Sequence, residues 1–523
     1  MDFKIIEIFK RGICIERNTG ARYATESDCR VLIDGKEACV SNLNVITVYG
    51  LIPDTEYEIS IEGCSQKERF KTKHESFLLN VKDFGAFGDG THPDTPAIQA
   101  AIMSCPKDGT VYIPKGDYFC TPIFLKSDMS LWIDEGATVY GDPDRHHYPV
   151  LPGVIRNEYD NDREISLASW EGNPLDCFAS LITAIDTENV EIFGRGCING
   201  NADKGDWWVD VRTKRIAWRP KLVFISGSKN IRVSGITVKN SPAWAVHPYY
   251  SDDLKFMNLE IWNPSNSPNT DGFDPESCTD ILLIGTKISV GDDCIAIKSG
   301  KLYMANYHYK ETERIEIRNC RLERGHGSVT VGSEVAGGVK GVRVSKCVFS
   351  ETDRGLRIKT RRGRGERSLI TDLRFEDLTM DRVHMPITVN MFYFCDPDGH
   401  TDYVQNQNAF PVDYRTPRIG TITAENVDCS GVDASFVCAN GLPESPIEKI
   451  ELKDVRVSYL PKEKRTPQCP IMMDGFPKMS GAGIFLKNVR EAVAENVKIE
   501  GSAESEPVLE NVEKASLDAD FIG

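Results

Sequence analysis

Three features that this sequence lacks narrow what it can encode. In 523 residues no apolar run approaches the ~20 residues of a membrane-spanning helix. The formal net charge of -16 argues against a nucleic-acid partner. The first ten residues, MDFKIIEIFK, are too charged for a secretory signal. We therefore expect no membrane and no nucleic-acid partner, and we predict a cytoplasmic location.

The sixteen cysteines form no Cys-x-x-Cys pair, which argues against a zinc ribbon or a redox motif. In a chain without an export signal they are expected to be reduced, buried, small apolar side chains rather than disulfides. Several lie in segments with strand character: Cys197, Cys278, Cys320, Cys347 and Cys429.

The first 75 or so residues alternate apolar and polar side chains at period two, with turn residues between the runs. This pattern predicts a small β-sandwich, which we assign to residues 1–76. The segment LIPDTEY at residues 51–57 resembles the Leu-x-Pro-x-Thr-x-Tyr segment of fibronectin type III modules. Whether the module binds anything or only acts as a spacer stays open.

The sequence then changes character, and residues 77–523 are assigned to a second domain. Residues 94–102 predict a short helix with Thr95 as its N-cap, suited to covering the end of a solenoid. Afterwards one pattern recurs: apolar-x-apolar, a two-residue bend, then apolar-x-apolar. Examples begin at Val190, Ile231, Ile281, Ile315, Val342, Leu373, Ile422 and Ile450.

Successive copies start roughly 23 to 50 residues apart, a spacing typical of solenoids. Amphipathic helices between the strands, which a doubly wound α/β domain would need, are lacking. The fold class is therefore predicted as all-β, a right-handed parallel β-helix behind a small β-sandwich. Two irregular stretches, residues 396–418 and 460–482, are expected to project as loops that wall a functional site.

Four polar groups fall on consecutive copies of this repeat: Asn269-Thr-Asp271, Gly291-Asp-Asp293, Gly325-His-Gly327 and Arg357-Ile-Lys359. Matching points of neighbouring coils stack ~4.8 Å apart, so these groups are expected to share one groove. Each group alone is more often a turn or a solvated strand face. Their fixed order in one repeat phase instead favours an acid/base site facing an anion-binding site.

With these four motifs the sequence resembles the polygalacturonase family, glycoside hydrolase family 28, over roughly residues 80 to 515. The resemblance implies hydrolysis of α-1,4-linked galacturonic acid by single displacement with inversion and without a metal or other cofactor. Asp292 would be the general acid, and Asp271 and Asp293 would hold and deprotonate the attacking water. Inversion calls for carboxyls about 6.5–9.5 Å apart and one raised pKa, which like-charge crowding supplies.

The same resemblance implies substrate-binding residues around the acids. His326 would hydrogen-bond the acid, and Arg357 and Lys359 would bind the substrate carboxylate. Asn269, Lys298 and Tyr393 complete the predicted set. A groove in so acidic a protein must be locally basic to take a polyuronate, and the densest basic run is residues 354–367; Arg364 and Arg367 in it are expected to be solvated. One of Trp207, Trp208, Trp218 and Trp244 could stack on a sugar or fill a corner.

The fibronectin-like appendage and the long loops resemble bacterial exo-acting members, so exo-polygalacturonase action on pectic oligo- or polygalacturonate is predicted. The oligomeric state is left open. Three alternatives remain: a rhamnogalacturonan or xylogalacturonan hydrolase, a calcium-dependent pectate lyase on the same fold, and a non-catalytic carbohydrate-binding solenoid.

Overall fold

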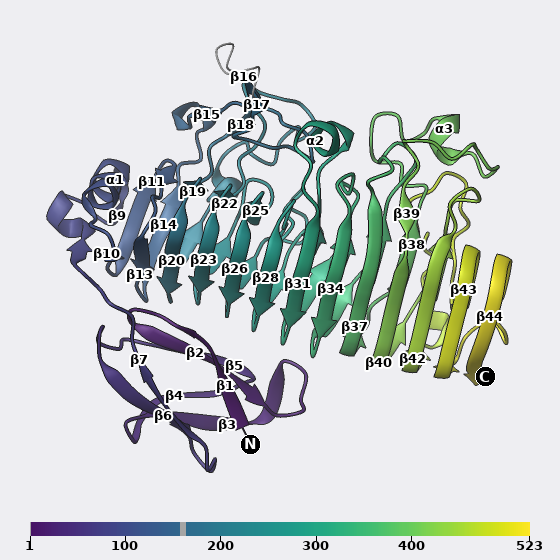
Figure 1. Ribbon diagram of the computed structural model, residues 1–523, viewed down its shortest axis with the longest axis horizontal. Helices are drawn as coiled ribbons and strands as arrows, with labels where there is room; N and C mark the ends of the chain where they lie inside the picture. The colour runs from purple at the N-terminus through teal and green to yellow at the C-terminus, as the bar shows by residue number, and fades with distance from the viewer. Residues whose placement is uncertain (1, 157–163, 523) are drawn as a thin grey trace.

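The computed structural model describes residues 2–156 and 164–522. A long stack of parallel strands dominates it, and a small antiparallel body lies against one side of the stack, next to its N-terminal half (Figure 1). Among the described residues no helix is long and apolar enough to cross a membrane.

The N-terminal body consists of two antiparallel sheets around one apolar core, which includes Ile13, Val31 and Phe70. The hydroxyl of Tyr57 accepts a 3.0 Å hydrogen bond from the backbone N–H of Ile52, as a tyrosine corner requires. The fibronectin assignment and the division at residue 76 stay predictions. The sheet orders are β1-β2-β5 (Asp2–Ile8, Gly12–Asn18, Val45–Tyr49) and β4-β3-β6-β7 (Lys36–Leu43, Ala24–Ile33, Glu56–Ile61, Lys67–Lys71).

Polar side chains fix this sandwich to the solenoid. Glu16 lies 3.0 Å from the Nε of Arg318 and accepts a 2.7 Å bond from Asn319. Glu7 contacts Lys255 at 2.8 Å and Arg232 at 3.2 Å. Because Glu16 and Arg318 are each under a tenth exposed, the sandwich is docked rather than loosely tethered.

The repeat predicted from the sequence forms a continuous parallel ladder. Val190 pairs with Ile231, then Leu254, Ile281 and Ile315 in turn, so each coil places an apolar residue over the one before. This confirms the right-handed parallel β-helix. The ladder comprises β8 (Leu78–Asn80), β10 (Gly109–Ile113), β13 (Met129–Ile133), β20 (Glu188–Gly194), β23 (Lys229–Ser234), β26 (Asp252–Met257), β28 (Thr279–Ile284), β31 (Thr312–Arg318), β34 (Val339–Ser345), β37 (Leu369–Asp381), β40 (Thr421–Val432), β42 (Ile447–Tyr459), β43 (Ala482–Glu500) and β44 (Val508–Ile522).

The helix α1 (Thr95–Ser104) lies at the N-terminal end of the solenoid, as expected. Its N-cap is Asp94, so the prediction of Thr95 was wrong by one residue. The buried carboxylate of Asp94 instead accepts backbone N–H bonds from Gly88 and Phe119, which ties the turn before the helix to the first coils.

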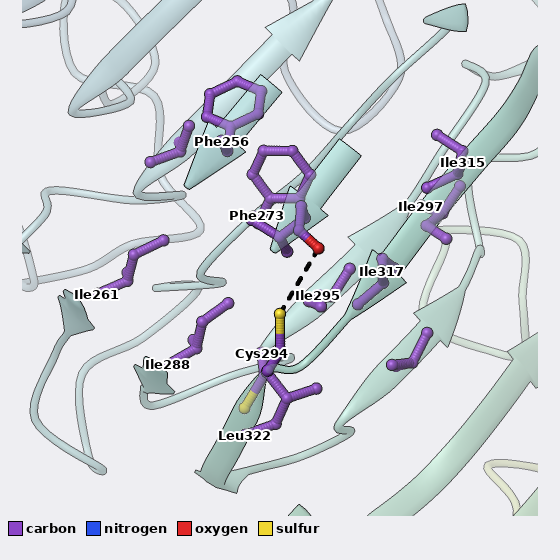
Figure 2. Packing of buried hydrophobic residues seen from close by; sticks show 14 of the residues in the cluster. Phe256, Ile261, Phe273, Ile288, Cys294, Ile295, Ile297, Ile315, Ile317 and Leu322 are labelled. Atoms are coloured by element: carbon purple, nitrogen blue, oxygen red, sulfur yellow. Dashed lines mark hydrogen bonds between the residues drawn. The ribbon is translucent and has the colours of Figure 1, made fainter. Parts of the chain in front are cut away.

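A second parallel ladder carries the four polar motifs. Phe273, Ile295, Val329 and Leu356 occupy matching positions on successive coils and point into the core. Figure 2 shows Phe256, Phe273, Cys294 and Ile295 packed together there. The ladder comprises β22 (Val223–Ser226), β25 (Val246–Tyr249), β30 (Ile295–Ile297), β33 (Val329–Val331), β36 (Arg354–Lys359), β38 (Met385–Asn390) and β41 (Ser435–Asn440).

The two predicted loops are present, between β38 and β39 (Arg418–Ile419), where α3 (Asp402–Gln405) lies, and between β42 and β43. A third long excursion, between β14 (Ala137–Gly141) and β19 (Ile182–Ile185), was not predicted. There Glu164 accepts hydrogen bonds from Tyr303 in α2 (Leu302–Tyr307) and contacts His308. Figure 1 shows this excursion, with β15 to β18, beside α2.

Candidate active site

Backbone hydrogen bonds place the four motifs side by side. Gly272 N–H donates to the carbonyl of Asp293 at 3.0 Å, and Cys294 N–H donates to that of Gly327 at 2.8 Å. Val329 pairs with Leu356, which brings Arg357 onto the next coil. The predicted stacking on consecutive coils is therefore confirmed.

The glycines of the Gly-His-Gly motif are needed for this close approach. A Cβ on Gly327 would lie 2.7 Å from the Oδ1 of Asp293, and a Cβ on Gly325 would lie 2.6 Å from the carbonyl oxygen of Asp292. Contacts that short are forbidden, so any larger residue would push the coils or the carboxylate away. The motif thus makes room for the acids.

Asp271, Asp292 and Asp293 meet in one cluster, with one carboxylate oxygen from each within 4.8 Å of the others. Asp271 and Asp293 are buried, whereas the side chain of Asp292 is 23% exposed. Asp292 is therefore the acid that a substrate can reach. These nearest oxygens are closer together than the separation expected for inversion.

Asp293 is held between two cations. The Arg357 guanidinium lies 2.9 Å from its Oδ1, and the Lys359 ammonium lies 2.9 Å from its Oδ2. Burial opposes ionisation, yet these two charges lower the pKa of Asp293 well below its usual range. Arg357 and Lys359 thus form ion pairs with Asp293, a role that the sequence did not predict.

The pKa of Asp271 is raised. Burial and the charge of Asp292 raise the pKa of Asp271 to about 7, against the opposing charge of Lys298. Crowding was expected to keep Asp292 protonated. The structure shows such an effect at Asp271, where burial leaves little solvent to screen the like charges of Asp292 and Asp293.

His326 lies beside the exposed acid, with its Nδ1 3.4 Å from the Oδ1 of Asp292. This contact raises the pKa of the imidazole above its ordinary value. His326 is half exposed and borders the groove, so the structure brings it to the acid that it was predicted to contact.

Lys298 balances the charge beneath the acids. Its ammonium lies 3.7 Å from Asp271, 3.5 Å from Asp274 and 3.4 Å from Glu334, and 4.4 Å from the centre of the Trp244 ring. Sequence reasoning missed Asp274 and Glu334. Asp274 stands three residues after Asp271, a signal that was visible, whereas nothing in the sequence distinguishes Glu334.

The cations also bear on the metal alternative. One oxygen from each acid could in principle meet at a cation. However, Arg357 and Lys359 already neutralise Asp293, and Lys298 lies against Asp271. The donor set therefore fits calcium poorly, because an added dication would stand beside three fixed positive charges.

A small recess lies one coil beyond the acids. Arg357, Lys359, Asn390 and Tyr393 line it, and Met472 of the 460–481 loop covers part of it. Lys359 lies 5.2 Å from the centre of the Tyr393 ring, and Asn390 donates to the carbonyl of Met472 at 3.0 Å. Tyr393 thus lies next to the predicted cation pair, and a loop covers this part of the groove.

The rest of the basic run is structural. Arg361 and Arg364 hold Asp396, and Arg362 is 1% exposed against Glu444. The prediction that Arg364 is solvated was wrong, since it is 3% exposed; Arg367 is exposed, as predicted. Carboxylates of Asp396 and Glu444 therefore pair with three arginines of the basic run.

Two of the four tryptophans fill the interior. Trp207 is fully buried against Tyr148 and Phe178, and Trp244 is 4% exposed beneath Lys298. Trp218 is partly exposed and stacks on Trp170 with ring centres 5.0 Å apart. Asn269, two residues before Asp271, has a left-handed backbone with φ of 54° and accepts a 2.6 Å bond from Arg219.

Comparison with known proteins places this chain in a family. The profile described as "Glycosyl hydrolases family 28" matches residues 160–475, and one described as "Rhamnogalacturonase A/epimerase, pectate lyase-like" matches residues 78–153. A probable polygalacturonase of Vitis vinifera is 30% identical over 400 residues, covering 74% of this chain and 76% of its own.

Two further relatives differ in mode of action. An endo-polygalacturonase of Pectobacterium carotovorum is 30% identical over 57% of this chain and 72% of its own. The solved family 28 exopolygalacturonase of Yersinia enterocolitica is 18% identical and shares the fold over 99% of both chains, with a TM-score of 0.73. The chain belongs to glycoside hydrolase family 28.

Proposed function

We propose that the protein hydrolyses α-1,4-galacturonosidic bonds of pectic oligo- or polygalacturonate. One observation carries this: a cluster of three acids, one of them reachable, bordered by Arg357 and Lys359. The cluster supplies proton transfer. Arg357 and Lys359 carry two positive charges against the single charge of Asp293, and the remaining positive charge suits an anionic sugar. Relatives whose names state polygalacturonase activity support the same substrate.

In the proposed reaction Asp292 protonates the departing glycosidic oxygen, because it is the most exposed of the acids. Asp271 and Asp293 hold the attacking water, and Asp271 takes its proton. Asp293, fixed as an anion by Arg357 and Lys359, supplies negative charge near the developing oxocarbenium ion. His326 orients the carboxyl of Asp292.

The substrate assignment is tested by comparing reducing ends released from polygalacturonate, rhamnogalacturonan and xylogalacturonan. Release from polygalacturonate well above the other two supports the proposal. Preference for either of the others would replace it with the corresponding hydrolase.

We propose that the reaction inverts the anomeric configuration, although the acids lie closer together than is usual for inversion. An acid/base and a nucleophile about 5–5.5 Å apart are typical of retention, whereas an acid and a base about 6.5–9.5 Å apart are typical of inversion. Here the nearest oxygens lie within 4.8 Å, so the water must sit among three acids rather than between two opposed ones. Proton NMR during hydrolysis would show the β-anomer first for inversion; an initial α-anomer would refute the single displacement.

We further propose exo action, since loops enclose the site. The carbonyl of Gly172 accepts a 2.8 Å bond from the backbone N–H of Lys301, and the Lys301 ammonium contacts Asp396 at 2.9 Å. Lys301 therefore joins the 142–181 excursion to the 391–417 loop. Such a wall suits a chain end better than a chain interior.

Viscosity separates the two modes. An exo enzyme shortens polygalacturonate from its ends, so viscosity should fall slowly relative to the reducing ends released. A steep early loss of viscosity would show endo action, as in the name of the Pectobacterium relative. The cytoplasmic location also stays a proposal, which cell fractionation would test.

A further inference from the structure

Arg219 lies at a junction of three coils. It is 4% exposed, just before β22, and its guanidinium lies 5.3 Å from the centre of the Trp170 ring. One terminal nitrogen donates to the carbonyls of Pro242 at 2.8 Å and Pro268 at 2.9 Å. The other donates to the Oδ1 of Asn269 at 2.6 Å. One side chain thus binds two turns of the solenoid and a motif residue.

The bond to Asn269 fixes which way its carboxamide points. A guanidinium carries only donors, so the atom that faces it must be the amide oxygen, and the usual ambiguity between oxygen and nitrogen disappears. The NH2 group is then turned away from Arg219. Among the described residues it meets no hydrogen-bond acceptor, although Asn269 is only half buried.

The two N–H donors of the Asn269 amide, two residues before Asp271, therefore lack a partner among the described residues. Solvent can satisfy these donors in the free enzyme, and a bound ligand with acceptor oxygens can replace that solvent. Hydroxyl and carboxylate oxygens of a uronic acid residue are acceptors of that kind.

The surroundings keep Arg219 charged. Burial lowers the pKa of its guanidinium to about 10, while Glu171, Asp271 and Asp292 oppose that effect. The group is therefore a cation at neutral pH, and its bond to the Asn269 oxygen is a strong, charge-assisted one.

We propose that Arg219 is a positioning residue: it holds the Asn269 carboxamide so that both amide hydrogens face the sugar bound at the acid cluster. The inference rests on the proposed function, because it requires a uronic acid at that place. Arg219 acts through Asn269 and does not itself touch the substrate.

A double-mutant cycle tests the coupling. Arg219→Lys keeps the positive charge but removes the guanidinium, whose two terminal nitrogens bond to different partners. Asn269→Ala removes the amide. With trigalacturonate as the probe, each single variant should lower kcat/KM about tenfold or more, as the loss of one well-placed hydrogen bond predicts. The double variant should be no worse than Asn269→Ala alone. Multiplying effects would show that the two residues act separately and would overturn the inference.

Further readouts separate positioning from folding. Arg232→Lys is the matched control: Arg232 is also buried and donates to the carbonyls of Ile231 and Asp253, but lies at the sandwich interface. It should lower the melting temperature and leave kcat/KM unchanged. If Arg219→Lys folds poorly, Arg219→Gln takes its place in the cycle. An inactive wild type would refute the proposed function, whereas an active wild type with independent effects would refute only this inference.

Discussion

Replacing Lys298 by methionine should move the pH dependence of the reaction. Lys298 is 3% exposed and lies 3.7 Å from Asp271, whose pKa of about 7 already reflects the opposing charge of this ammonium. Without the ammonium, ionising Asp271 becomes harder. Its pKa must therefore rise in Lys298→Met.

The size of the shift follows from the distance. Two unit charges about 4 Å apart interact by about 4 kcal/mol at an effective dielectric constant of about 20, and one pKa unit corresponds to about 1.4 kcal/mol. Asp274 and Glu334 compete for the same ammonium, at 3.5 and 3.4 Å, so Asp271 receives only part of this energy. We expect the pKa to rise by about one unit.

The assay is kcat/KM for a galacturonate trimer against pH. As the proposed base, Asp271 must be ionised, so activity should fall as pH drops below about 7. In Lys298→Met that acidic limb should lie about one unit higher. Lys310→Met, which removes a partly exposed pair with Asp252, should leave it in place.

Two results would refute this reasoning. An acidic limb at the same pH in Lys298→Met would show that Lys298 does not set the pKa of Asp271. A limb near neutrality on the alkaline side would instead mark Asp271 as the acid. Melting curves accompany both variants, because removing one partner of a buried charge cluster costs about 3–5 kcal/mol.

Three further predictions follow. Asp292→Asn should lower kcat about 10²–10⁴-fold while calorimetry shows oligogalacturonate binding nearly intact; an unchanged rate would remove Asp292 from its role. Glu16→Gln should destabilise the protein by about 3 kcal/mol in urea unfolding, because it breaks a buried pair with Arg318. Burial opposes ionisation of Glu16, but bonds from Arg318 and Lys4 lower its pKa. The stabilisation is therefore present above about pH 4.3 and is lost as pH falls through the lower folded pKa. Equal acid sensitivity of the wild type and Glu16→Gln would contradict this prediction. A chelator should leave activity unchanged, and products should not absorb in the ultraviolet, whereas a lyase would fail both tests.

The fold could be predicted from the sequence because each coil repeats the same pattern of apolar residues. Ile231, Ile281 and Ile315 recur at the start of bent strands, and stacking them fills the core column by column. The excursion at residues 142–181 lacked any such repeat. It is positioned by individual contacts, such as the hydrogen bond from Lys301 to Gly172, which no local sequence pattern predicts.

The site was predictable where its residues share a repeat phase. Asp271, Asp293 and Arg357 follow the strand register, so their meeting could be derived from the motif order. Other properties of the site depend on burial and on the paths of turns, which the motif order does not give. That Asp271 holds the raised pKa depends on depth below the surface, and the approach of Glu334 depends on a turn whose path is set by its neighbours.

We propose that enclosing loops and a three-acid cluster make this chain an enzyme that removes galacturonate units from a chain end. The most direct test follows products over time from galacturonate hexamers labelled at the reducing end. We expect one short product to accumulate from the start, while the labelled chains shorten by the same step each time. Labelled products of every intermediate length at early times, or no hydrolysis at all, would contradict it.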